Sequence, residues 1–187
     1  MSTIMEQLKE VFSAPGWKDE LAEQLERVQI LEEGAADMDE KLEICKHLHL
    51  LSIQSRKGRK VGFADEGTPL RISAQAAVLC FKRCIEICEQ LRKQGQKDFR
   101  ITDQLNRSYY GISDLLLRGA NSCGDEAMRL SLLQESRRYA MLQHDLLKKT
   151  IAEGTDEHEK DFAAQFIDIC NMQLEDIDGN LQALKGN

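Results

Sequence analysis

Residues 162–184 read FAAQFIDICNMQLEDIDGNLQAL, a stretch in which apolar side chains recur at every third or fourth position. Because an α-helix turns once in about 3.6 residues, this spacing gathers them on one helical face. The whole chain of 187 residues holds only two prolines and 5% aromatic residues, a composition that favours helices over sheets. The apolar seam consists of Phe162, Phe166, Cys170, Leu174, Ile177, Leu181 and Leu184.

Glycines divide the second half of the chain at regular intervals. Gly95, Gly124 and Gly154 stand 29 and 30 residues apart, and each follows a periodic apolar segment. Glycine commonly ends a helix, and Asp98, Asp125 and Asp156 are suited to cap the next helix or to stand in its first turn. Long helices of similar length favour a lengthwise antiparallel bundle. We predict four such helices at about 71–94, 98–122, 125–153 and 156–184.

Three shorter helices are predicted ahead of this bundle, within residues 3–55. The second of them ends at Gly34 and has an apolar stripe that we expect to face the core: Trp17, Leu21, Leu25, Val28 and Leu31. The predicted fold is therefore all-α, an antiparallel bundle of four long helices (about 71–184) with three shorter N-terminal helices packed on it. The length fits a single helical domain spanning residues 1–187.

One long stretch, SRKGRKVGFADEGTPL (55–70), lacks apolar periodicity, and we interpret residues 56–70 as an exposed flexible loop. Its first half is basic, and an aromatic side chain follows the cations. Such a loop suits an acidic protein surface, because clustered charge raises the rate of encounter and an apolar anchor supplies affinity. We therefore predict a partner-binding site at Arg56, Lys57, Arg59, Lys60 and Phe63.

The net charge of −7 conceals acidic ends and a basic middle. Residues 1–44 carry −8, residues 45–120 carry +7 and residues 121–187 carry −6. The isoelectric point of about 5.2 argues against a dedicated nucleic-acid-binding protein. The longest apolar run, AAVLCF (76–81), is far too short to cross a membrane, and the N-terminal residues lack the apolar run of a signal peptide. We expect a cytoplasmic protein with reduced cysteines and neither membrane nor nucleic acid as partner.

Cysteines at 80, 84 and 88 form the sharpest chemical pattern, one per helical turn in CFKRCIEIC (80–88). Cys80 and Cys88 lie about 12 Å apart along a helix axis, too far to bind one tetrahedral ion. No C-x-x-C pair occurs in the sequence. Because Cys84 and Cys88 continue the seam of a bundle helix, we interpret the cysteines as small apolar core residues. A thiol or soft-metal sensor built on Cys80, Cys84 and Cys88 is the alternative.

Paired carboxylates indicate another alternative, a metal-dependent nucleotide hydrolase that holds magnesium between helices. The pairs Glu40/Glu43 and Glu86/Glu89 have a suitable Glu-x-x-Glu spacing. Neither pair is followed by Glu-x-x-Asp on the next helix, and none of the four histidines has glutamate three residues before it, as a di-iron bundle requires. Sequence motifs for a catalytic nucleophile or a phosphate-binding loop are also absent.

By elimination, the sequence favours a non-enzymatic helical interaction protein, an adaptor or regulatory subunit that binds a protein partner. We expect no catalytic residue, no cofactor and no bound metal. The sequence leaves the formation of homo-oligomers open.

Overall fold

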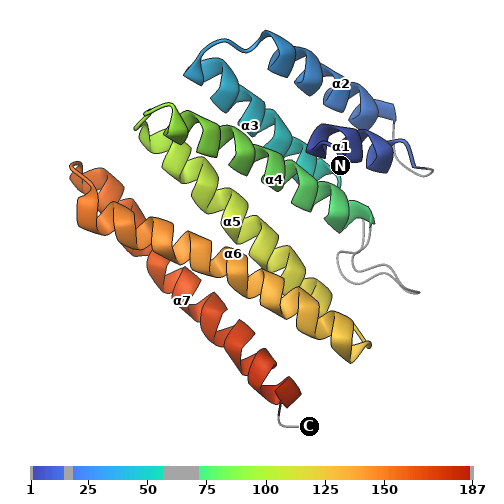
Figure 1. Cartoon of the computed structure of the whole chain (residues 1–187), viewed down its shortest axis with the longest axis vertical. Coiled ribbons are helices and arrows are strands. Elements are labelled where there is room, and N and C mark those ends of the chain that lie inside the picture. The colour runs from blue at the N-terminus through green and yellow to red at the C-terminus, as the bar shows by residue number, and fades with distance from the viewer. Residues whose placement is uncertain (1, 15–18, 57–71, 186–187) are drawn as a thin grey trace.

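Seven α-helices and no strand make up the part of the chain that the structure describes. The computed structural model describes residues 2–14, 19–56 and 72–185, which are coloured in Figure 1. In chain order the helices are α1 (Ile4–Phe12), α2 (Asp19–Gly34), α3 (Met38–Gln54), α4 (Ile72–Lys93), α5 (Phe99–Asn121), α6 (Glu126–Glu153) and α7 (Glu157–Lys185).

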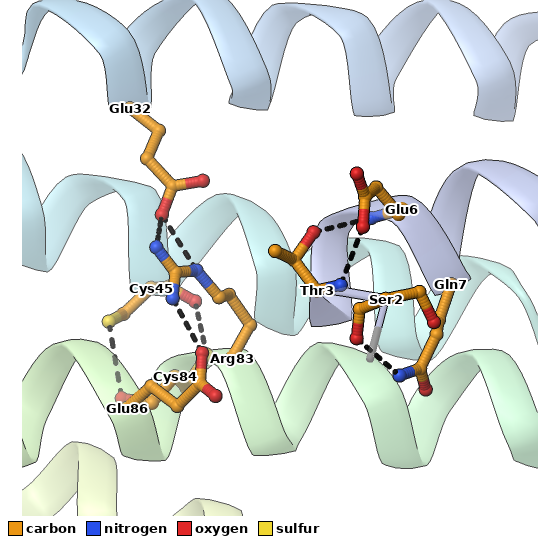
Figure 2. Close-up of polar contacts among 9 residues, drawn as sticks. All are labelled: Ser2, Thr3, Glu6, Gln7, Glu32, Cys45, Arg83, Cys84 and Glu86. Carbon is orange, nitrogen blue, oxygen red and sulfur yellow. Dashed lines mark hydrogen bonds and ion pairs between the residues drawn. The ribbon is translucent and has the colours of Figure 1, made fainter.

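Polar side chains fix where several helices begin. The Thr3 hydroxyl accepts a hydrogen bond from the Glu6 amide at 3.2 Å, and the Glu6 carboxylate accepts one from the Thr3 amide at 2.6 Å (Figure 2). Asp37 caps α3 with the same reciprocal geometry. These contacts satisfy amides that have no partner inside the helix. The predicted caps Asp98 and Asp125 begin α5 and α6, as expected from the sequence.

The long helices follow one another as neighbours in space. Helix α4 packs on α5, α5 on α6 and α6 on α7, whereas within the described residues α4 and α7 share no contact. Helices α3 and α2 continue the row beyond α4, and α1 lies against α4 and α2 (Figure 1). The predicted all-α arrangement, with three shorter N-terminal helices packed on four long ones, is confirmed. Because α2 stands at one end of the row, part of its surface has none of the seven described helices over it.

Helices α4 and α5 approach closely at Gly111, a glycine inside α5. A Cβ atom at this position would lie 2.6 Å from two ring carbons of Phe81 on α4, closer than packed carbon atoms tolerate. The Phe81 ring is buried and also meets the His49 ring of α3 edge-on, with the ring centroids 5.2 Å apart. Gly111 therefore lets a large aromatic side chain fill the space between three helices.

Helix α7 is covered on one side only. Ala163, Cys170 and Ile177 are its fully buried residues, whereas Phe162 and Phe166 of the predicted seam stay partly exposed. The reason is position, because α7 is the last helix of the row and packs on α6 with a small contribution from α5. None of the described helices is long and apolar enough to cross a membrane.

Candidate protein-binding groove

Of the predicted basic site, the structure describes one residue, Arg56. The other four residues of the site lie outside the described ranges: Lys57, Arg59, Lys60 and Phe63. Arg56 stands two residues after the end of α3, and its Nε donates a hydrogen bond of 2.8 Å to the Ser52 carbonyl. Burial lowers the pKa of Arg56, while the carboxylate of Asp114 on α5 opposes that shift. The Arg56 guanidinium therefore satisfies a carbonyl at the end of α3, which has no partner inside the helix.

The predicted cysteine stripe lies inside the core. Cys80, Cys84 and Cys88 on α4 have no exposed surface, and neither does Cys45 on α3. The Cys84 thiol donates to the Cys45 carbonyl at 3.5 Å, and the Cys45 thiol lies 4.0 Å from the Cys84 carbonyl (Figure 2). The interpretation of the stripe as core residues is confirmed.

The acidity of these thiols follows from their surroundings. Burial raises the pKa of the Cys80 thiol to about 12. Hydrogen bonding to Cys45, together with burial, raises the pKa of Cys84 and Cys88, and the same contacts lower the pKa of Cys45. All of these thiols, Cys45 included, lie in side chains without contact to solvent. Within the described ranges, no three His, Cys, Asp or Glu side chains are gathered as a metal ion requires.

The carboxylate pairs considered for magnesium are engaged by other groups. Glu40 accepts capping hydrogen bonds at the start of α3. Glu43, Glu86 and Glu89 each form an ion pair with a cation three residues away on the same helix. A magnesium site needs several carboxylate oxygens directed at one point. These four carboxylates instead cap, or form ion pairs within, the helices that carry them.

An apolar groove lies between α2 and α3, on the part of their surface that the other helices leave uncovered. Buried Val28 from α2 and Leu51 from α3 form its floor, and its volume is about 500 Å³. A second depression of about 270 Å³ shares Ile30 and Leu31 with the first and extends along α2 to Gly34. The two depressions adjoin at these two side chains, and together we call them the α2–α3 groove.

Large apolar side chains stand exposed along this groove. Ile30 is 64% exposed, Leu50 is 52% exposed and Leu31 is 44% exposed. The prediction that Leu31 faces the core is wrong, because Leu31 lies on the side of α2 where none of the described helices packs. Leu21, Leu25 and Val28 of the same predicted stripe are buried as expected, and Trp17 lies outside the described residues.

Sequence reasoning missed the groove, although a signal for it was present. Two apolar residues stand next to each other in each helix, Ile30 with Leu31 and Leu50 with Leu51. Neighbouring residues on a helix point about 100° apart, so a narrow core-facing stripe cannot take both. Two such doublets on helices joined by a short turn indicate a second apolar face.

The helical hairpin formed by α2 and α3 is acidic. Residues 21–54 hold eight acidic and three basic side chains, a net charge of −5. Arg27 and His47 line the middle of the α2–α3 groove, and Glu40 and Glu43 line the end near Gly34. A hydrogen bond from Lys46 lowers the pKa of Glu43, so this carboxylate is charged at neutral pH.

Arg83 on α4 connects the outer helix α2 to the rest of the protein. Its Nε donates to the Glu32 carboxylate on α2 at 2.7 Å, and the guanidinium also pairs with Glu86 on its own helix at 2.5 Å (Figure 2). Helix α2 otherwise packs on α3 and α1, so this contact adds an attachment to α4. The wall of the groove formed by α2 is thereby held in position.

No family model, no curated protein and no solved structure matches this chain. Three physical features define the candidate site: the shape of the α2–α3 groove, its exposed apolar side chains and the acidic charge around it.

Proposed function

We propose that this protein is a non-enzymatic interaction protein, an adaptor or regulatory subunit, that binds a segment of a partner protein in the α2–α3 groove. The observation that carries this proposal is the exposure of Ile30, Leu31 and Leu50 along one groove. Contiguous apolar surface is costly in water, and a large exposed patch marks an interaction site in many proteins. An apolar floor with a polar rim is also the usual anatomy of a protein interface.

The basic loop is proposed as a second, separate contact. Its cations and Phe63 suit an acidic surface on a partner, whereas the acidic hairpin around the α2–α3 groove suits positive charge. We also propose a reducing, cytoplasmic location, because all six cysteines are free.

The hydrolase and thiol-sensor alternatives have less support. The carboxylates that a hydrolase would need form ion pairs with neighbouring cations, and the thiols that a sensor would need are buried in the core.

The test compares two leucine-to-aspartate variants of the full chain in affinity capture. Leu50→Asp puts a charge into the α2–α3 groove, and Leu142→Asp puts the same charge on α6, at a leucine that is 39% exposed. Proteins captured by the wild type should be lost with Leu50→Asp and kept with Leu142→Asp, while circular dichroism shows both variants folded. Binding of such a partner should also slow hydrogen exchange in residues 24–54, which locates the contact. Equal capture by all three forms would contradict the proposal.

A further inference from the structure

The α2–α3 groove has the shape and charge of a binding site for one kind of segment. We infer that its occupant is a basic amphipathic helix of about three turns, presented by the partner protein; this inference rests on the function proposed above.

The dimensions of the groove fit a helix. The groove runs along α2 from Gln24 to Gly34, about 15 Å at 1.5 Å per residue, which matches about three helical turns. A third helix laid over two antiparallel helices can place apolar side chains at positions i, i+3, i+4 and i+7 onto Val28, Leu31 and Leu51. Such a helix satisfies its own backbone hydrogen bonds.

An extended peptide fits the groove less well. Its backbone amides and carbonyls would lie over apolar side chains without partners, which costs free energy. Peptides that bind as added strands need an exposed sheet edge, and the described residues contain no strand. The geometry therefore selects a helical occupant over an extended one.

The charge of the hairpin selects a basic helix. Glu23, Glu26 and Glu33 on α2 are exposed and form no ion pair within the described residues. At the Gly34 end of the groove, Glu43 adds a charged carboxylate that is half-exposed. Glu43 and Glu40 line the groove itself, whereas the three glutamates of α2 lie outside its lining and add to the negative field around it. Lysine or arginine side chains that flank the apolar stripe of a partner helix would enter this field, and charge of opposite sign speeds encounter and suppresses wrong partners.

A second copy of this chain is disfavoured as the occupant for the same reason. A two-fold interface brings the same surface of both copies together. Pairing two α2–α3 hairpins would set two acidic surfaces against each other, because each hairpin stays net negative even with Glu32 and Asp39 paired to Arg83 and Arg100 of other helices. The repulsion weakens such a contact unless salt screens it.

The experiment measures binding of three synthetic helical peptides to the full chain by fluorescence polarisation. The peptides share one leucine stripe over about 14 residues, or about four turns, and differ in a polar face of lysine, glutamine or glutamate. The lysine peptide should bind at least about 10-fold more tightly than the glutamate peptide, and the difference should shrink as salt rises. Glu43→Lys should reduce this preference.

Two aspartate variants separate groove binding from general attraction between charges. Ile30→Asp changes an exposed groove residue, and Met172→Asp changes a residue on α7 that is 70% exposed. Each adds the same negative charge, which by itself attracts the lysine peptide. Loss of binding in Ile30→Asp with binding kept in Met172→Asp therefore reports the loss of an apolar contact in the groove.

The outcomes distinguish the inference from the proposed function. Equal binding of the three peptides would overturn the basic charge of the occupant. If no peptide binds while Leu50→Asp still abolishes partner capture, the occupant is not such a helix, although the groove still binds a partner. A wild-type dimer that Ile30→Asp dissociates would make the occupant a second copy. If neither peptide binding nor capture depends on groove residues, the proposed function itself fails.

Discussion

Gln143 on α6 donates a hydrogen bond of 2.9 Å to the side-chain oxygen of Asn106 on α5, and both residues are buried. Sliding either helix along the other would leave these amides unpaired in an apolar core, so the bond favours one alignment of α5 and α6.

Removing one partner of this bond should therefore be costly. We expect Asn106→Leu to lower the free energy of unfolding by about 1–3 kcal/mol, because the Gln143 amide loses its acceptor without reaching water. Urea denaturation measures the change. The double variant Asn106→Leu/Gln143→Leu should recover part of the loss, since it removes both polar groups. A double variant less stable than the sum of the two single changes would contradict this account.

The ion pair between Arg83 and Glu32 should hold α2 against the row. Both side chains are less than a quarter exposed. Glu32→Gln should lower the free energy of unfolding by about 1–3 kcal/mol, because a largely buried guanidinium loses one of its two carboxylate partners. Hydrogen exchange in α2 should also become faster. The control is Glu135→Gln, which breaks a more exposed pair with Arg138 and should change stability by less than about 1 kcal/mol. Equal effects of both variants would count against the special role of Glu32.

At Gly111, helix packing and helix propensity predict opposite effects of a substitution by alanine. Alanine is favoured over glycine inside a helix by about 0.5–1 kcal/mol. Gly111→Ala should nevertheless destabilise the protein by about 1–3 kcal/mol, since its Cβ would collide with the buried Phe81 ring. Gly179→Ala in α7, where nothing lies within 4 Å of the added atom, should be neutral or stabilising. Thermal denaturation of the two variants compares them directly, and a stabilised Gly111→Ala would refute the close contact.

Stability should fall at alkaline pH because buried thiols resist ionisation. The Cys80 thiol has its pKa raised to about 12 in the folded protein, whereas a thiol in the unfolded chain has a pKa of about 8.5. Between these values the unfolded chain has released a proton that the folded chain keeps. The free energy of unfolding then decreases as pH rises, by up to about 1.4 kcal/mol per pH unit for each such thiol.

Urea denaturation between about pH 8 and pH 10.5 measures this dependence, in the range where the thiol of the unfolded chain ionises. The variant Cys80→Ala should show a shallower decline than the wild type, because it lacks one of the buried thiols. Cys170→Ala should flatten the decline to a similar degree, since burial raises the pKa of Cys170 to about 11, which also lies above this pH range. Parallel pH profiles for wild type and Cys80→Ala would contradict the assigned burial of this thiol.

The helices themselves were predictable from the sequence because their limits depend on local chemistry. Each long helix begins and ends within about one residue of the predicted boundary. The capping residues Asp98 and Asp125 stand directly before α5 and α6, and Gly154 directly follows α6. Gly95, for example, adopts φ 83° just after α4, a conformation that glycine takes without strain. The burial of Cys80, Cys84 and Cys88 likewise followed from their helical spacing.

The candidate site was not predictable in the same way. Whether Leu31 faces the core depends on which helix packs beside α2, a contact between segments that periodicity does not encode. Helix α2 ends the row, so Leu31 and Ile30 remain exposed, although the apolar pattern of α2 resembles that of a covered helix. The basic loop was conspicuous in sequence for its charge, whereas the α2–α3 groove consists of ordinary leucine and isoleucine residues.

The most direct test of the account is site-specific photo-crosslinking from the α2–α3 groove in the cell that makes this protein. A photoreactive amino acid replaces Leu50 in one form of the full chain and Met172 in another, and mass spectrometry identifies the cross-linked peptides. The account predicts that position 50 yields a partner peptide with a leucine-like stripe of helical period flanked by lysine or arginine, and that Ile30→Asp removes this product. Equal products at positions 50 and 172, or a product at position 50 that Ile30→Asp leaves unchanged, would contradict it.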